Sequence, residues 1–237
     1  MGNSFFRFKQ FTVHQAQCAM KVCTDACILG AYFADRVKDG SSVLDIGAGT
    51  GLLTLMLAQK IQGQFHAIEK DGDACNQLNE NVRISPWKEQ MRVWQGDVLH
   101  FPFGMKFDFI ICNPPFYENK LKSDSAPKNM ARHDSGLTLT SLPDIIYRNL
   151  KEEGRFGVLL PYPRSAEFEK LALQKGFHLL EKLLIRQTPK HDFFRSIMYY
   201  SRVKEKEPTT GELTIRLEEG NYSDSFRSLL KAYYLQF

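Results

Sequence analysis

The sequence predicts an α/β fold built on a doubly wound, mostly parallel sheet. From residue 42 to about residue 175, short apolar runs alternate with helical segments, as in proteins whose parallel strands are joined by helices. A glycine-rich turn leads from the first of these runs into a helix, an arrangement typical of ligand-binding turns in such sheets. Two later apolar runs, 179–187 and 196–203, are separated by a short proline-containing region and are expected to pair antiparallel.

The elements are predicted along the chain as follows. Residues 5–11 mix phenylalanine with basic residues and are interpreted as a strand or an arm. Thr24 or Asp25 is expected to cap the first helix. Strands are predicted at 42–46, 65–68, 91–95, 107–112, 156–160, 179–187, 196–203 and 212–217. Helices are predicted at 26–37, 52–61, 72–84, 139–150, 165–175 and 223–234. No stretch rich in Gly, Ser or Pro divides the chain, so we expect a single domain over 1–237.

Composition narrows the class of protein. The 237 residues are 43% hydrophobic and 24% charged, which is ordinary for a globular protein. No stretch approaches the roughly 20 apolar residues of a membrane span, and the amino terminus has no apolar signal core. Five cysteines without paired spacing are expected to be reduced thiols, so we expect a cytoplasmic protein that is not bound to a membrane. Cys23 and Cys27 can share a helical face, but no further ligands complete a zinc set, and we expect no metal. The net charge of +4 is compatible with a polyanionic partner.

The first candidate for ligand binding is the turn after the strand at 42–46. Gly47, Gly49 and Gly51 have the spacing G-x-G-x-G, and without Cβ atoms they let the backbone approach a ligand closely. The helix that follows points its free N–H groups toward that ligand. Leu52 stands where nicotinamide-binding sequences have a third glycine, and no G-x-x-x-x-G-K-[ST] motif is present. A nicotinamide cofactor and a nucleoside triphosphate are therefore both disfavoured.

Two carboxylates follow the next two strands. Glu69 comes 24 positions after Asp45, where a carboxylate can accept hydrogen bonds from both hydroxyls of a ribose. Asp97 follows the third strand and can accept a hydrogen bond from the amino group of an adenine. Each alone is more often a solvated charge or a turn residue. Because both lie at carboxyl ends of successive strands, where open α/β sheets bind ligands, we interpret them together as ligand-binding residues.

The fourth strand ends in Asn113-Pro114-Pro115-Phe116. Two prolines cannot continue a strand ladder, so they form a stiff corner at its carboxyl end. The Asn113 side-chain oxygen and a neighbouring main-chain carbonyl can accept both hydrogens of one NH2 group, which turns the nitrogen lone pair toward an electrophile. Phe116 can stack on the ring that carries this amine. The alternative is a strand that simply ends in a Pro-Pro turn beside a core phenylalanine.

These motifs resemble those of the S-adenosylmethionine-dependent amino-methyltransferases with an N-P-P-[FYW] motif. The resemblance implies a Rossmann-like, seven-stranded class I methyltransferase fold with a closing antiparallel hairpin. Further motifs resemble the bacterial tRNA1(Val) (adenine(37)-N6)-methyltransferase family over nearly the whole chain. They are Phe8-Lys9-Gln10-Phe11, Cys18-Ala19-Met20-Lys21-Val22 with Thr24-Asp25, Ala131-Arg132-His133, Asn221-Tyr222-Ser223 and Tyr233-Tyr234-Leu235. The chain is then divided into an N-terminal arm (1–25), a catalytic core (26–205) and a C-terminal strand and helix (206–237).

The resemblance also assigns roles to the site residues. The cofactor S-adenosylmethionine is expected to contact Lys21, Thr24, Asp45, Gly47, Gly49, Gly51, Glu69, Asp97, Val98 and Asn113. Lys21 and Thr24 would cover its methionine end, although Lys21 is equally well explained as a surface charge. The catalytic residues are expected to be Asn113, Pro114 and Phe116. The substrate RNA is expected to contact Pro115, Phe116, Lys120, Lys122, Arg132 and His133, and the last four are otherwise solvated loop charges.

The predicted reaction is methyl transfer to the exocyclic N6 of an adenine in tRNA, at position 37 of tRNA1(Val), by a monomer. Alignment of the two reactants is expected to dominate the rate, so no catalytic base is assigned. The anticodon-loop adenine must be splayed out to reach the Asn113 corner. Alternatives with the same corner are a protein glutamine N5-methyltransferase, a ribosomal RNA guanine-N2 methyltransferase and a DNA adenine methyltransferase. A further alternative is a non-catalytic cofactor-binding protein that interacts with RNA.

Overall fold

The computed structural model of the 237-residue chain describes residues 3–18, 20–114, 136–205 and 207–236. One eight-stranded sheet forms its centre, with strand order β10-β8-β9-β7-β6-β3-β4-β5. These strands are β3 (Ser42–Ile46), β4 (Gln64–Glu69), β5 (Met91–Gln95), β6 (Phe107–Cys112), β7 (Leu150–Pro161), β8 (His178–Arg186), β9 (Phe193–Ser201) and β10 (Thr209–Thr214). The helices are α1 (Thr24–Ala34), α2 (Leu52–Ala58), α3 (Gly72–Ile84), α4 (Leu142–Asn149), α5 (Tyr162–Gln174) and α6 (Asp224–Leu230).

The sheet confirms the predicted topology. Strands β5, β4, β3, β6 and β7 run parallel, and β9 is antiparallel to both of its neighbours, β7 and β8. The seven strands of the expected fold are therefore present with their closing hairpin. Strand β10, predicted slightly later in the chain, pairs parallel with β8 and extends the sheet by one edge strand.

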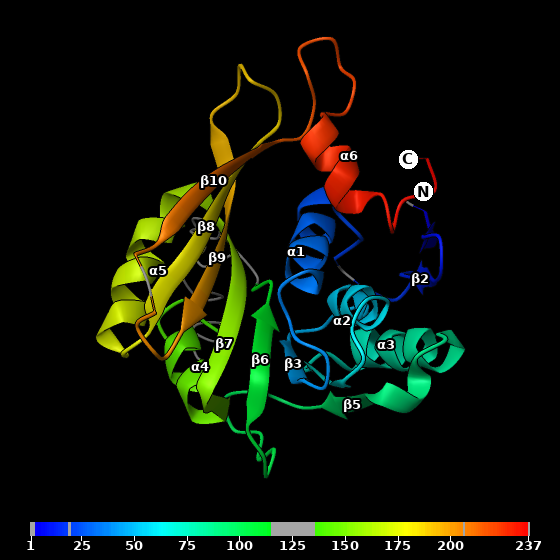
Figure 1. The fold of residues 1–237 in the computed structure, drawn as a ribbon. Coiled ribbons are helices and arrows are strands. Elements are labelled where there is room, and N and C mark those ends of the chain that lie inside the picture. The colour runs from blue at the N-terminus through cyan, green and yellow to red at the C-terminus, as the bar shows by residue number, and fades with distance from the viewer. Residues whose placement is uncertain (1–2, 19, 115–135, 206, 237) are drawn as a thin grey trace, which may run out of the picture.

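Side chains that alternate along the buried strands build two cores, one on each face of the sheet. On β3, for example, Val43 belongs to the core that also contains side chains of α1, α2, α3 and α6, whereas the next residue, Leu44, belongs to the core that contains side chains of α4 and α5. Figure 1 shows these two helical layers around the sheet. This double covering explains why the parallel strands are almost continuously apolar. It also leaves the carboxyl edge of the strands available for a ligand.

Several predicted boundaries differ by a few residues from the observed ones, and two of the differences have an identifiable reason. The residue that caps α1 is Cys23, so Thr24 is already helical, and the Asp25 carboxylate instead pairs with Arg195 at 2.7 Å. Strand β7 begins at Leu150, six residues earlier than expected, because Leu150 pairs with Phe107 before an irregularity shifts the register.

The amino-terminal residues form a separate small hairpin of β1 (Phe5–Arg7) and β2 (Thr12–His14). It contacts the end of the chain, where the Lys9 N–H donates to the Tyr233 carbonyl at 2.8 Å. The Tyr233 hydroxyl in turn donates to the Met56 carbonyl in α2 at 3.0 Å. Figure 1 accordingly shows the N- and C-terminal segments close together beside α6 and α2. The first and last parts of the chain are thus held against the same side of the core.

Within the described residues, no helix combines the length and apolar character that a membrane crossing requires. All five cysteines are free thiols. No cluster of three or more His, Cys, Asp or Glu side chains suited to a metal ion occurs in the part of the chain that the structure describes.

Candidate active site

The glycine turn leads from β3 into α2 and requires three left-handed backbone positions. The φ angles are +68° at Gly47, +54° at Gly49 and +82° at Gly51, a region that favours glycine. A Cβ at Gly47 or Gly49 would meet no atom within 4 Å, so open space adjoins both. A Cβ at Gly51 would lie 2.5 Å from Leu78 Cδ1. The first two glycines therefore leave room for a ligand, whereas the third is needed for packing against α3.

A cavity of about 360 Å³ opens beside this turn at the carboxyl ends of β3, β4 and β6. This volume falls within the roughly 300–1,000 Å³ of typical small-molecule sites. Six residues predicted to bind the cofactor line it: Lys21, Gly47, Glu69, Asp97, Val98 and Asn113. Four others, Thr24, Asp45, Gly49 and Gly51, do not line it. The sheet thus brings together most of the predicted set from five separate stretches of sequence, and the roles of these residues in binding stay predictions.

Glu69 ends β4 with both carboxylate oxygens held by backbone N–H groups. Oε2 accepts from Gly49 at 2.8 Å and Oε1 accepts from Asp71 at 2.9 Å. Each oxygen has a second lone pair, so the carboxylate can still accept hydrogen bonds from a ligand in the cavity.

Asp97 follows β5 and is kept ionised by its neighbours. Its Oδ2 pairs with Lys70 Nζ at 2.9 Å, and its Oδ1 accepts from the Leu99 N–H at 3.1 Å. Burial opposes ionisation, but these hydrogen bonds outweigh it, and the pKa of Asp97 is lowered. An ionised Asp97 can accept a hydrogen bond from a ligand amino group.

Asp45 lies beneath the glycine turn instead of in the cavity wall. Its Oδ2 accepts from the Thr54 hydroxyl at 2.7 Å and from the Thr54 N–H at 3.2 Å, which ties β3 to α2. Its Oδ1 is buried without a hydrogen-bond partner among the described residues. Burial therefore raises the pKa of Asp45 to about 7, although the bonds from Thr54 oppose the shift.

Asn113 stands at the end of β6 and lines the cavity. Its side-chain Oδ1 is buried and has no hydrogen-bond partner among the described residues. Leaving a buried amide oxygen unpaired costs about 1–3 kcal/mol, so this position favours a ligand that donates a hydrogen bond. Pro114 is buried. The remaining predicted catalytic and RNA-contacting residues lie outside the described residues, namely Pro115, Phe116, Lys120, Lys122, Arg132 and His133.

The segment before α1 forms a wall of the cavity that sequence reasoning found only in part. Lys21 was predicted, but Met20, Val22 and Cys23 also line the cavity and supply apolar surface. The buried Gln15 holds this segment, because its carbonyl accepts from Lys21 Nζ and its Oε1 accepts from the Val22 N–H at 2.8 Å.

Asn81 on α3 was also missed. It is fully buried, and its Nδ2 donates to the carbonyls of His14 at 2.8 Å and Thr50 at 2.9 Å. Its Oδ1 accepts from the His14 N–H at 2.9 Å. Asn81 therefore joins the amino-terminal hairpin to the glycine turn. No sequence signal marks Gln15 or Asn81, since an amide in a polar stretch predicts solvent exposure.

Comparisons with known proteins agree with this geometry. A family model described as a methyltransferase small domain matches residues 24–139. The fold is similar to that of a predicted O-methyltransferase from Agrobacterium tumefaciens, with a TM-score of 0.65 at 16% identity over 88% of this chain and 96% of that one. It is also similar to a proposed class I S-adenosylmethionine-dependent methyltransferase from Listeria monocytogenes, with a TM-score of 0.62 at 16% identity over 84% and 67% of the two chains. The fold and the site define a class I methyltransferase, a class whose methyl donor is S-adenosylmethionine.

The sequence narrows this class. The chain is 41% identical to the tRNA1(Val) (adenine(37)-N6)-methyltransferase of Dyadobacter fermentans, over 99% of each chain. It therefore belongs to the tRNA1(Val) (adenine(37)-N6)-methyltransferase family.

Proposed function

We propose that this protein transfers a methyl group from S-adenosylmethionine to the exocyclic N6 of adenine 37 in the anticodon loop of tRNA1(Val). The observation that carries the proposal is the buried Oδ1 of Asn113 in the wall of the cavity, which has no hydrogen-bond partner among the described residues. That oxygen is a hydrogen-bond acceptor, and the N6 amine of adenine carries two N–H groups that can donate to it. The full-length similarity to the relative from Dyadobacter fermentans supports the choice of tRNA as the substrate.

The cavity fits the methyl donor. S-adenosylmethionine supplies a methyl group on a positively charged sulfur, which is electrophilic without further activation. In our proposal Glu69 accepts hydrogen bonds from its ribose, and the ionised Asp97 accepts one from its adenine. The open space beside Gly47 and Gly49 leaves room for S-adenosylmethionine to approach the backbone of the glycine turn. The side chains of Met20 and Val22 add apolar surface to the same cavity.

Asn113 and the corner that follows it act on the substrate amine. The side-chain oxygen of Asn113 and the Pro114 carbonyl each accept one hydrogen of the NH2 group. Two such bonds draw the nitrogen out of conjugation with the ring and orient its lone pair toward the methyl donor. The nitrogen loses a proton readily after methylation, so alignment, worth roughly 7–11 kcal/mol in well-oriented reactions, replaces acid–base catalysis. Phe116, which lies outside the described residues, is the candidate for stacking on the adenine.

We further propose that the whole chain acts as one catalytic unit, as a monomer in the cytoplasm. The hydrogen bond from Lys9 to the Tyr233 carbonyl supports the first point, because it joins the arm to the C-terminal segment. Five free cysteines support a reducing compartment.

The deciding experiment supplies labelled S-adenosylmethionine and unmodified tRNA to the purified protein and then maps the modified nucleotide. We expect N6-methyladenine at position 37 of tRNA1(Val). A release-factor protein, ribosomal RNA and DNA serve as parallel substrates, and labelling of one of these in place of tRNA would overturn the proposal. Tight binding of the methyl donor without transfer to any substrate would indicate a non-catalytic protein.

A further inference from the structure

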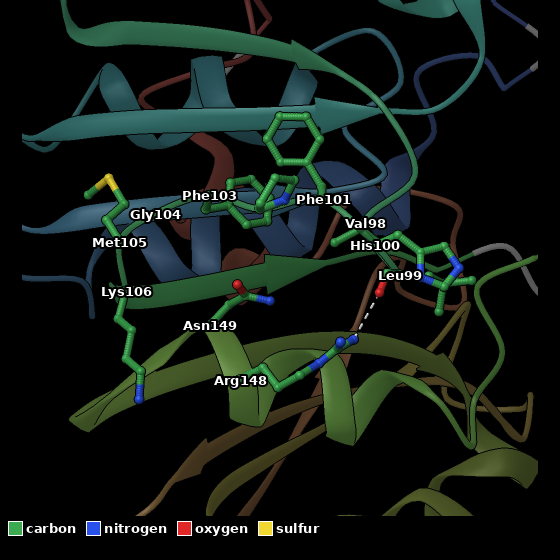
Figure 2. A pocket seen from close by; sticks show the side chains of 11 residues that line it. Val98, Leu99, His100, Phe101, Phe103, Gly104, Met105, Lys106, Arg148 and Asn149 are labelled. Carbon is green, nitrogen blue, oxygen red and sulfur yellow. Dashed lines mark hydrogen bonds between the residues drawn. The ribbon is translucent and has the colours of Figure 1, made fainter.

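A second hollow, of about 610 Å³, lies beside the candidate active site on the face of the sheet that carries α4. Its walls are the connection from β5 to β6 and the last turn of α4, as Figure 2 shows. The connection spans residues 96–106 and contains no helix, although a crossover between parallel strands is usually helical. Val98 lines both this hollow and the cofactor cavity. The two cavities therefore share one lining residue.

The charged residues of the hollow are all basic. They are His100, Lys106 and Arg148, and no carboxylate lines the hollow among the residues that the structure describes. Lys106 makes no ion pair with any described residue. Arg148 Nη2 donates to the Leu99 carbonyl at 3.1 Å, which uses one of the five N–H donors of its guanidinium. Figure 2 shows the Arg148 side chain extended toward Leu99, with this bond as a dashed line.

A third hollow, lined by residues at the amino ends of β6 and β7, provides a contrast. Its four cationic side chains are matched by four carboxylates, from Asp108, Glu152, Glu153 and Glu205. Several of these are paired within the protein, as Lys151 is with Asp108 at 2.8 Å and Arg155 with Glu205 at 2.8 Å. That surface is electrostatically balanced, whereas the hollow beside Val98 has an excess of positive charge.

Two aromatic side chains also line the second hollow. Phe101 and Phe103 line it, are only partly buried, and have ring centroids 4.8 Å apart. A partly exposed aromatic surface among cations is the arrangement with which proteins hold single-stranded nucleic acid, since rings contact bases or sugars while cations contact phosphates.

We propose that this hollow is a docking site for the phosphate backbone of the substrate RNA, outside the nucleotide that is methylated. The inference rests on the proposed function, in which the substrate is tRNA. RNA held at Lys106 and Arg148 runs along the hollow from the amino end of β6 toward Val98, the residue that this hollow shares with the candidate cofactor cavity. The site therefore contributes to substrate affinity and to the orientation of the loop, and it takes no part in the chemical step.

The test measures kinetics and salt-dependent binding of unmodified tRNA1(Val) to the double variant Lys106→Gln/Arg148→Gln. We expect KM for tRNA to rise roughly tenfold, whereas kcat and KM for S-adenosylmethionine stay within about twofold. The slope of log Kd against log salt should become shallower by roughly 1.4–1.8, because each lost phosphate contact removes about 0.7–0.9.

Two further variants separate phosphate binding from a structural effect. Lys38→Gln removes one charge from the balanced hollow and should leave both the KM and the salt slope unchanged. Arg148→Lys keeps the charge and should retain most of the salt slope. The single variant Arg148→Gln is measured beside it, and a purely structural role of the bond to Leu99 would make the two equally defective.

The outcomes distinguish this inference from the proposed function. If the native protein methylates tRNA and the double variant matches it in KM and salt slope, the docking site is overturned while the function stands. If the native protein methylates no tRNA, the function fails, and unchanged binding of total tRNA by the double variant would overturn the docking site separately.

Discussion

The backbone N–H of Gly49 donates a hydrogen bond of 2.8 Å to Oε2 of Glu69. This bond ties the glycine turn to the end of the neighbouring strand, so two parts of the candidate cofactor site are fixed relative to each other. The Asp71 N–H fixes the other carboxylate oxygen at 2.9 Å. The carboxylate is therefore oriented by two backbone donors before a ligand enters.

Replacement of Glu69 by Gln tests this arrangement. A glutamine amide must turn its NH2 group toward one of the two backbone N–H donors, which leaves that donor unpaired at a cost of about 1–3 kcal/mol. We expect the affinity for S-adenosylmethionine, measured by calorimetry, to fall roughly 10- to 100-fold. The variant Glu89→Gln removes an exposed carboxylate elsewhere and should bind normally. Equal affinities for the two variants would remove Glu69 from the cofactor site.

Asn113→Ala tests the candidate catalytic corner. The change deletes the acceptor at the end of β6 without altering Glu69 or Asp97, so we expect methyl transfer to tRNA to be abolished and the affinity for S-adenosylmethionine to stay within a few-fold. Single-turnover transfer and calorimetry measure the two quantities separately. Activity that survives the substitution would show that Asn113 does not orient the amine.

The buried Asp45 predicts a specific dependence of stability on pH. Burial raises its pKa from an ordinary 3.8 to about 7. Between these values the folded protein holds a proton that the unfolded chain has lost, so the free energy of unfolding should decrease as the pH rises from about 4 to 7. A difference of about three pKa units corresponds to at most roughly 4 kcal/mol, lost in full above pH 7.

Urea unfolding of Asp45→Asn between pH 5 and pH 8 checks this expectation. The neutral amide can still accept from Thr54, so the contribution of position 45 to the slope should disappear and the variant should gain stability relative to the native protein at pH 8. The control is Asp108→Asn, because bonds from Lys151 and Ser42 outweigh burial and lower the pKa of Asp108, which places its titration below this range. A profile of Asp45→Asn parallel to that of the native protein would assign the slope to another group.

Asn81 provides a test of the link between the amino-terminal hairpin and the glycine turn. Asn81→Ala leaves the carbonyls of His14 and Thr50 without their donor, and we expect a loss of roughly 2–4 kcal/mol in the free energy of unfolding. Protease cleavage within the hairpin should accelerate, and S-adenosylmethionine should bind more weakly. The exposed Asn76, on the same helix, is the matched control, and its replacement by Ala should change stability by less than about 0.5 kcal/mol. Unchanged proteolysis of the Asn81 variant would argue against the link.

Much of the fold was predictable because its signals are local. The strands β3, β5 and β6 begin and end where their apolar runs do, and the glycine turn and the double proline mark where two of the strands stop. Since parallel strands share a carboxyl edge, the convergence of Glu69, Asp97 and Asn113 on one cavity followed from the topology.

The parts that were missed depend on contacts between distant residues. Gln15 and Asn81 are buried because they satisfy backbone groups of other segments, and single-residue polarity predicts the opposite. The early start of β7 depends on the pairing of Leu150 with Phe107 across the sheet. The pairing of Asp97 with Lys70 likewise arises only after β4 and β5 come together. These features require the assembled sheet, which a linear pattern does not encode.

The contact between Lys9 and Tyr233 has a consequence for the synthesis of the protein. The two residues are 224 positions apart, so a ribosome must add 224 residues after Lys9 before the hydrogen bond between them can form. Most strands of the central sheet have emerged by then and can pair with one another first. The hairpin of β1 and β2, although it is synthesised early, gains its contact with Tyr233 only afterwards. The wall of the candidate cofactor cavity that follows this hairpin is therefore expected to become ordered late in maturation, after the sheet that forms the rest of the site.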